Sequence, residues 1–181
     1  MGKISDIALI SQVVLFNNKN AYGELVERYQ DTVRRFLIHL CGDADLAYDL
    51  AQETFIKAYI SIGNFQGLSN FQTWILRIAY NQFYDHIKVL KNQKLERYDL
   101  LYEGQFTADP AYIEDMRMDI KSACLQLRAD ERTAIVLFYL EELPIKQIAK
   151  IMRSPEGNVK SLLSRGRTKL SQILKQSDYE G

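Results

Sequence analysis

The chain has 181 residues, enough for one or two domains, and its hydrophobic fraction of 47% is sufficient to build packed cores. Its formal net charge at pH 7 is zero, which at first argues against nucleic-acid binding. The N-terminus lacks the pattern of a signal peptide, no apolar run is long enough to cross a membrane, and Cys41 and Cys124 belong to no metal-binding motif. We therefore expect a cytoplasmic protein with buried, reduced thiols and no metal.

The charges are distributed unevenly along the chain. The segment from Lys146 to Lys175 holds eight basic residues and one acidic residue, whereas residues 96–121 hold seven acidic and three basic residues. The neutral sum therefore combines a basic C-terminal part with an acidic centre. A basic cluster of this kind is typical of a nucleic-acid-binding surface.

Apolar residues at helical spacing predict two helices in the first part of the chain, over residues 5–16 and 21–41. Gly42 is well placed to end the second helix, and Asp43 to cap the helix that follows. The predicted buried side of the first helix consists of Ile7, Ile10 and Val14.

Two longer helices are expected between residues 43 and 94, joined by the polar segment GNFQGLSN, in which Gly, Ser and Asn disfavour helix. The first has one apolar face and one polar face. The second interleaves aromatic and cationic side chains beside the loop, a pattern that can stack on unpaired bases and hold phosphates. An aromatic stripe is also typical of a packed core, and for Trp74, Ile78 and Phe83 packing is the favoured interpretation.

Residues 95–110 have weak periodicity and scattered acids, which predicts a flexible acidic linker. Helices resume at residue 111. Asp130 can cap the following helix ERTAIVLFYLEEL, which is so apolar from Ala134 to Leu140 that it should be largely buried. Two further helices follow, separated by a tight turn in which Ser154 is the expected N-cap. Short helices, a tight turn and a basic second helix predict a helix-turn-helix, although a plain helical hairpin is the competing interpretation.

Two blocks of sequence carry a family resemblance. DLAYDLAQETFIKAY followed by FQTWILRIAYNQFYDHIK closely resembles region 2 of the ECF (extracytoplasmic function, group 4) RNA polymerase sigma factors of the sigma-70 superfamily. LPIKQIAKIMRSPEGNVKSLLSRGRTKL resembles region 4 of the same family. The resemblance implies an all-α fold of two small helical domains: region 2 as a helical bundle at residues 1–94, the linker at 95–110, and region 4 as a helix-turn-helix at 111–176.

The resemblance implies a function in transcription initiation. A sigma factor binds core RNA polymerase, here through the β′ clamp helices and the β-flap, directs it to promoter DNA at the minus-10 and minus-35 elements, and promotes strand opening. No cofactor is implied. The chain contains no P-loop, GxGxxG or HExxH motif, so we do not expect an enzyme. The sequence leaves open whether an anti-sigma factor also binds.

The resemblance also assigns candidate residues. The core polymerase-binding candidates are Asp45, Asp49, Gln52 and Glu53. The minus-10 DNA-binding candidates are Asn64, Ser69, Asn70, Arg77, Asn81, His86 and Lys88. The minus-35 candidates are Glu156, Asn158, Lys160 and Ser161 near bases, and Arg153, Arg165 and Arg167 at phosphates. Asn64 and Ser69 can alternatively serve only to turn the chain. Leu162 stands where the family usually has arginine, which puts a phosphate contact there in doubt.

Two other classes of protein compete with this interpretation. A transcription regulator with a LuxR-type helix-turn-helix and a helical sensor domain would explain the C-terminal blocks, but not the DLAQETF and FQTW segments together. A helical adaptor that binds only protein is the third hypothesis.

Overall fold

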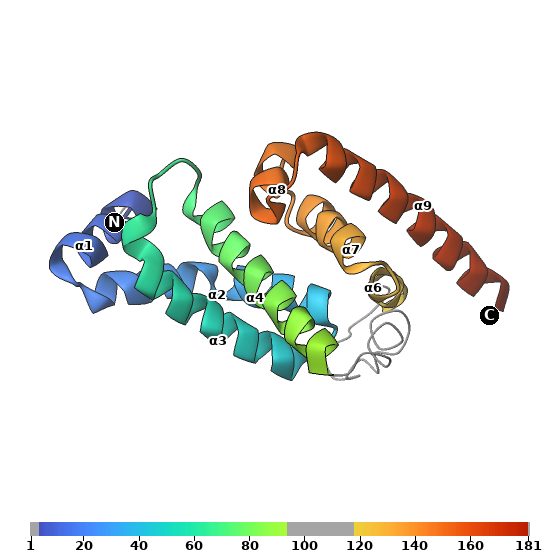
Figure 1. Cartoon of the computed structure of the whole chain (residues 1–181), viewed down its shortest axis with the longest axis horizontal. Helices are drawn as coiled ribbons and strands as arrows, with labels where there is room; N and C mark the ends of the chain where they lie inside the picture. The colour runs from blue at the N-terminus through green and yellow to red at the C-terminus, as the bar shows by residue number, and fades with distance from the viewer. Residues whose placement is uncertain (1–3, 94–117, 181) are drawn as a thin grey trace.

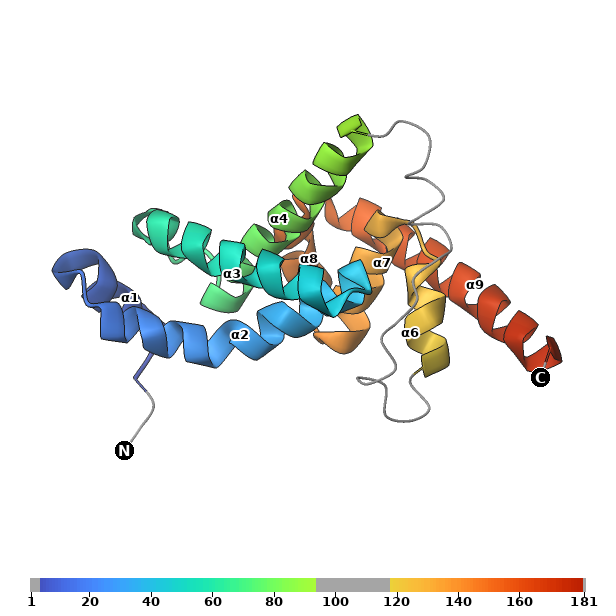
Figure 2. The ribbon, with the colours of Figure 1, turned by 90° about the horizontal axis from the view of Figure 1, so that it is seen from below.

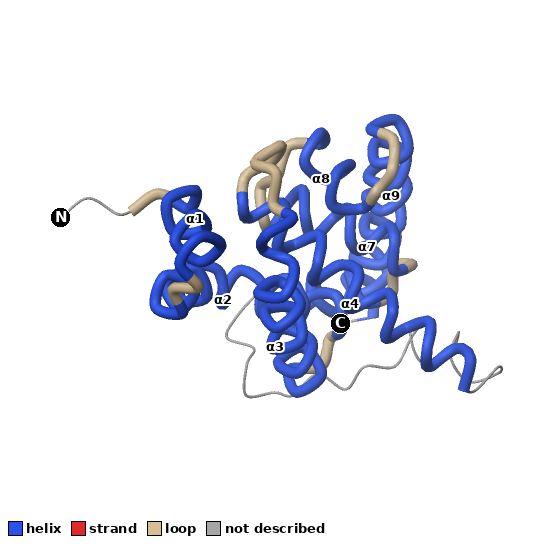
Figure 3. The backbone as a smooth tube through the Cα atoms, turned by 60° about the vertical axis from the view of Figure 1, so that its left-hand side comes forward, coloured by secondary structure: helices blue, strands red, loops and turns tan. Residues whose placement is uncertain are grey.

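The computed structural model describes residues 4–93 and 118–180, and within these ranges every regular element is helical (Figures 1 and 3). The all-α prediction is confirmed. The N-terminal module, residues 4–93, contains α1 (Asp6–Phe16), α2 (Lys19–Cys41), α3 (Ala44–Ser61), the 3₁₀ turn η1 (Ile62–Asn64) and α4 (Phe71–Gln93). The C-terminal module, residues 118–180, contains α6 (Met118–Leu125), α7 (Ala129–Ile135), the π-helical turn η3 (Val136–Leu140), α8 (Ile145–Met152) and α9 (Glu156–Glu180). The predicted linker, 95–110, lies outside the described residues.

Side-chain caps fix the boundaries of the first three helices. The carboxylate of Asp43 accepts a hydrogen bond from the Leu46 amide at 3.0 Å, as its predicted capping role requires. Gly42 ends α2 with φ 71°, a left-handed conformation that glycine adopts without steric cost, and its amide donates to the Ile38 carbonyl at 2.8 Å. Both predictions for the α2–α3 junction are confirmed.

The predicted buried side of α1 is wrong for two of its three residues. Ile10 is buried, but Ile7 and Val14 are exposed, and the buried side of α1 is completed by Leu9 and Val13. The sequence DIALISQVVLF is apolar almost all round, so its periodicity does not single out a face. The orientation of α1 is instead fixed by tertiary contacts, including an ion pair from Arg28 of α2 to Asp6 at 2.8 Å.

The N-terminal module is a bundle in which α2, α3 and α4 pack against one another and α1 covers one end of α2 (Figure 2). Phe36 and Phe83 are fully buried at its centre. Trp74 is partly buried, with its ring centroid 5.5 Å from those of Phe65 and Phe71. The packing interpretation of the aromatic stripe therefore holds for Phe83, and Trp74 packs on one side while remaining partly accessible on the other. None of the helices in the described part of the chain is long and apolar enough to span a membrane.

In the C-terminal module, α9 lies across α6, α7 and α8. The predicted Asp130 cap is wrong, because α7 begins at Ala129 and the Asp130 carboxylate instead accepts from the adjacent Glu131 amide at 2.9 Å. The apolar run after it is buried from Ala134 to Leu137, whereas Tyr139 and Leu140 are exposed. The start of α9 also differs by one residue from the prediction, since the carbonyl of Pro155, not Ser154, accepts the first helical hydrogen bond.

α9 lies close against α7 at Gly166, where a Cβ atom would lie 2.8 Å from Ile135 Cγ1. We expect Gly166→Ala to lower the free energy of unfolding by about 1–3 kcal/mol, because the added methyl group overpacks this contact. Gly23→Ala is the matched control, because no atom lies within 4 Å of its Cβ position and the change should stabilise the α2 interior by about 0.5–1 kcal/mol. Urea unfolding of both variants gives the comparison, and equal stability would contradict the described packing.

Candidate nucleic-acid interface

A cavity of about 380 Å³ lies where the loop after α3 meets the first turns of α4. This volume is large enough to hold a small planar group such as one nucleobase. The cavity is lined by polar side chains and by the indole ring of Trp74. Its lining includes Asn64, Gln66, Ser69, Trp74, Arg77, Asn81 and, from the C-terminal module, Arg153.

Local interactions shape the loop that forms one wall of this cavity. The Phe65 ring packs edge-on against Phe71 and Trp74, with centroids 6.0 and 5.5 Å away, and this anchors the loop to the core. Gly67 turns the chain at φ 69°. Asn70 caps α4, because its side-chain oxygen accepts from the Thr73 amide at 2.8 Å. The loop backbone is therefore held in place, while Asn64 is left exposed at its edge.

The structure brings together only part of the predicted minus-10 set. Asn64, Ser69, Arg77 and Asn81 line the cavity, whereas Asn70, His86 and Lys88 do not. Asn70 is occupied as a cap. His86 and Lys88 lie further along α4, about 14–17 Å beyond Arg77 at 1.5 Å per residue. The sequence interpretation missed Gln66 as a lining residue. For Trp74 it favoured packing over base stacking, and the place of this indole in the cavity lining keeps the stacking alternative open.

The outer face of α3 is exposed and carries the predicted polar residues together with the exposed apolar side chains of Tyr48, Ile56 and Ile60. Asp45, Asp49, Gln52 and Glu53 are all exposed, while Leu50 beneath them is buried. Glu53 is tied into its own module, because the buried Gln82 side chain donates to it at 2.7 Å. Asp45 and Asp49 form no ion pair within the described residues, so their carboxylates are open to a partner.

The N-terminal turns of α9 present a separate polar surface. Glu156, Asn158, Lys160 and Ser161 are all exposed there. Val159, Leu162 and Leu163 are buried and attach α9 to its own module. Leu162 stands where the family usually has arginine. Its apolar side chain is 2% exposed and packs inside the module, so it makes no contact with a phosphate.

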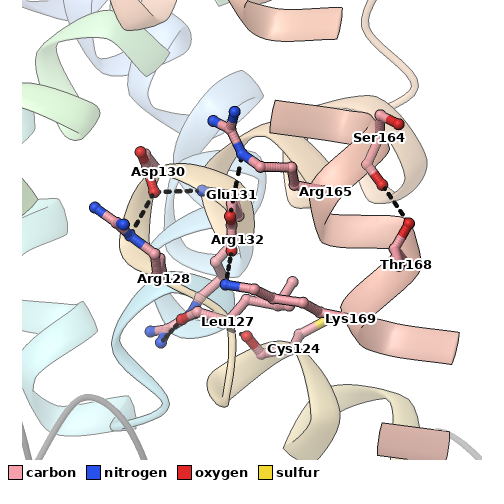
Figure 4. Close-up of polar contacts among 10 residues, drawn as sticks. All are labelled: Cys124, Leu127, Arg128, Asp130, Glu131, Arg132, Ser164, Arg165, Thr168 and Lys169. Carbon is pink, nitrogen blue, oxygen red and sulfur yellow. Dashed lines mark hydrogen bonds and ion pairs between the residues drawn. The ribbon is translucent and has the colours of Figure 1, made fainter. Parts of the chain in front are cut away.

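Arg165 has an intramolecular role that the sequence did not reveal. Its Nε atom lies 3.4 Å from a carboxylate oxygen of Glu131, and Lys169 Nζ lies 2.8 Å from the other oxygen (Figure 4). The Glu131 side chain is only 3% exposed, so the two cations compensate a buried charge. Arg167, by contrast, is exposed, and it forms no ion pair with any other described residue.

Comparisons with known proteins match both modules. Residues 25–92 match Sigma-70 region 2, and residues 117–170 match Sigma-70 region 4. The ECF RNA polymerase sigma factor SigW of Bacillus subtilis (strain 168) is 31% identical over 170 residues, covering 87% of this chain and 91% of SigW. The chain belongs to the ECF family of RNA polymerase sigma factors.

Other relatives of this sigma factor agree with that assignment. The RNA polymerase sigma-H factor of Pseudomonas aeruginosa is 33% identical over 170 residues, covering 87% of this chain and 88% of that protein. The solved structure of the sigma factor RpoE in complex with the anti-sigma factor NepR from Bartonella quintana is 28% identical, with a TM-score of 0.73 and coverage of 85% of this chain and 96% of that one. The LuxR-type alternative is not favoured, because it does not account for region 2.

Membership of the family fixes the class of activity. This sigma factor acts in transcription initiation, and its family consists of initiation factors rather than catalysts. The loop and all residues that line the cavity except Arg153 lie within the part that matches region 2. Arg153 and the exposed turns of α9 lie within the part that matches region 4.

The Glu131 contacts generate a stability prediction. We expect Arg165→Ala to lower the free energy of unfolding by about 0.5–1 kcal/mol, because it removes one of the two cations that compensate the Glu131 carboxylate. The effect should be small, because the Arg165 side chain is 56% exposed and the ion pair is screened by water. Arg167→Ala removes the same charge two residues away and should leave stability unchanged. Thermal denaturation followed by circular dichroism measures both. Equal effects of the two substitutions would show that the Glu131–Arg165 contact contributes nothing.

Proposed function

We propose that this sigma factor binds core RNA polymerase, recognises both promoter elements and promotes strand opening, with the cavity beside α4 as its minus-10 site. The observation that carries the proposal is the convergence of Asn64, Ser69, Arg77 and Asn81 on one cavity, beside Trp74, that is large enough for a nucleobase. Flipping a base out of duplex DNA costs a few kcal/mol. Stacking offsets about 1–3 kcal/mol per base, and the polar lining supplies hydrogen bonds to the base edge.

The N-terminal turns of α9 are the proposed reader of the minus-35 element. In a helix-turn-helix, the first residues of the second helix reach the base edges in the major groove. Glu156, Asn158, Lys160 and Ser161 are exposed at these positions. Arg153 and Arg167 are proposed phosphate contacts. The Arg165 guanidinium already contacts Glu131, so we propose a smaller contribution from Arg165 to phosphate binding.

The exposed polar face of α3 is the proposed contact to core polymerase. Its carboxylates and amides suit an arginine-rich helical partner, which the resemblance identifies as the β′ clamp helices. The β-flap is the proposed partner of the first helices of the C-terminal module. A solved relative is in complex with an anti-sigma factor, which supports such an inhibitor as a further partner.

The same proposal includes the division into region 2 at residues 1–94, a linker at 95–110 and region 4 at 111–176. The protein would act in the cytoplasm, where promoter DNA and polymerase are found, and would have no catalytic activity of its own.

Strand opening tests the minus-10 assignment. We expect holoenzyme carrying Arg77→Ala with Asn81→Ala to open promoter DNA roughly tenfold less, because about 1.4 kcal/mol of base capture is lost. Recruitment through the C-terminal module should be retained. Permanganate footprinting of unpaired thymines measures opening, and mobility shift of the closed complex measures recruitment. Val89→Ala, at an exposed position further along α4, is the control. Normal opening by the double variant would remove the cavity from the mechanism.

Core binding tests the α3 surface. We expect Asp49→Lys to weaken the affinity for core polymerase about tenfold, because a charge-assisted contact becomes a like-charge repulsion. Glu27→Lys, an equal charge change at an exposed position on α2, should leave affinity unchanged. Titration of labelled sigma factor with core polymerase gives both constants. A folded Asp49→Lys variant with unchanged affinity would exclude this face from the interface.

A further inference from the structure

A buried carboxylate lies behind the helix that carries the proposed minus-35 reader. The Glu131 side chain on α7 is 3% exposed, and its two oxygens contact two cations of α9, with Arg165 Nε at 3.4 Å and Lys169 Nζ at 2.8 Å (Figure 4). Well-packed apolar side chains in place of a buried ion pair often leave stability unchanged or raise it. A gain in stability is therefore a weak explanation for an acid at this position, and the orientation of its partners is a better one.

The contact with Glu131 engages only one edge of the Arg165 guanidinium. A guanidinium carries five N–H donors in a fixed plane, one on Nε and the others on the two terminal nitrogens. Nε faces Glu131, whereas the terminal nitrogens form no hydrogen bond with any residue that the structure describes. Figure 4 shows them on the side of the guanidinium turned away from Glu131, and the Arg165 side chain is 56% exposed. The carboxylate thus leaves an outward-facing pair of donor groups.

Arg165 lies on the same side of α9 as two of the proposed base readers. It follows Ser161 by four residues and Asn158 by seven, and these spacings place all three on one helix face. A different side of α9, which includes Val159 and Leu163, is buried against the module. The guanidinium therefore extends the surface that meets the major groove when α9 reads DNA.

A fixed pair of donor groups suits a base better than a phosphate. A phosphate contact needs only a nearby cation and carries no sequence information. Guanine presents two acceptors, O6 and N7, on its major-groove edge, and a bidentate contact from a basic side chain is the commonest specific contact to this base. The two terminal nitrogens of Arg165, held in one orientation by the contact at Nε, match that pair of acceptors.

Lys169 completes the arrangement by holding the second carboxylate oxygen. Its Nζ atom donates to this oxygen at 2.8 Å, which fixes the carboxylate and leaves the first oxygen for Arg165. One carboxylate beside two cations leaves one net positive charge in the cluster. Glu131 can therefore orient Arg165 without making this surface repel DNA.

We propose that Glu131 is a positioning residue for promoter recognition: it holds Arg165 at Nε, so that the two terminal nitrogens bind one guanine of the minus-35 element. This inference rests on the proposed function of α9 as the minus-35 reader. In this assignment Arg165 contacts mainly a base, and an acid that itself lies outside the DNA-binding surface controls the base preference.

Base preference measures this role. The experiment uses holoenzyme, formed from the full chain and core polymerase, on a promoter that it transcribes, randomised over the minus-35 element. Glu131→Gln keeps the shape of the side chain and removes its charge, so we expect the preference for guanine at one position of the element to fall about tenfold. Glu141→Gln is the matched control, because it removes another buried carboxylate, with a 1% exposed side chain, whose partner Arg35 lies on α2. The control should keep the wild-type base preference.

A double-mutant cycle shows whether Glu131 acts through Arg165. Arg165→Ala should lower the same guanine preference at least as much as Glu131→Gln does. Once Arg165 is replaced, Glu131→Gln should have no further effect on base preference, because the side chain that it orients is gone. Additive effects of the two substitutions would overturn the inference, since Glu131 would then influence recognition by another route.

Two further results would also overturn the inference. One is an unchanged guanine preference in a folded Glu131→Gln variant. The other is an equal loss of affinity on all sequences in Arg165→Ala, with the slope of log K against log salt reduced by about 0.9, which would identify a phosphate contact. The proposed minus-35 function fails separately, if neither Asn158→Ala nor Lys160→Ala changes the base preference.

Thermal denaturation shows whether each variant folds. If Glu131→Gln does not, Glu131→Asp replaces it, because aspartate keeps the buried charge but withdraws the carboxylate from Arg165 by one methylene group. We expect Glu131→Asp to lower the guanine preference about threefold. An unchanged preference in this variant would count against the inference in the same way.

Discussion

The described structure depends on one buried guanidinium. Arg132 is 0% exposed and donates hydrogen bonds to the carbonyls of Cys124, Leu125 and Leu127 within its own module, and to Leu40 at the end of α2. The last carbonyls of a helix have no partner inside the helix, and the negative end of the helix dipole lies there. A single cation therefore satisfies carbonyls at the ends of α6 and α2 together. Its burial would be costly without these acceptors, which makes the boundary between the modules a specific interface.

The thiols at this boundary are kept unreactive by the same packing. Cys41 and Cys124 are both buried and free, and burial raises the pKa of Cys41 to about 12 and that of Cys124 to about 11. The expectation of buried, reduced thiols is confirmed for both. Since the thiolate is the reactive form, neither residue is suited to nucleophilic or redox chemistry in this conformation.

Local signals in the sequence were sufficient for the helices and for the caps at the α2–α3 junction, but not for the starts of α7 and α9. Gly42 and Asp43 mark a helix boundary through interactions within a few residues, so the pattern alone predicts them. The same is true of Leu50 and Phe83, whose burial follows helical periodicity. Signals of this kind also located the loop and the aromatic helix of the candidate site.

The remaining features depend on contacts between distant residues. Glu131 and Arg132 are charged and no local pattern names their partners. Both are buried, because these partners include groups on α9 and α2. The sequence predicts Arg165 as a phosphate contact. Its ion-pair partner Glu131 lies 34 positions earlier in the chain, so no local pattern indicates that the two residues meet. The placement of Arg153 on the proposed minus-10 cavity likewise requires the packing of α8 on α4, which no local pattern specifies.

The central claim is that this chain directs core polymerase to promoters of its own. Run-off transcription with core polymerase on a library of genomic promoter fragments tests it most directly. The account predicts discrete transcripts that depend on this protein and start at a fixed spacing downstream of a shared pair of sequence elements. Stoichiometric binding to core without any specific transcript, or no binding to core, would contradict it.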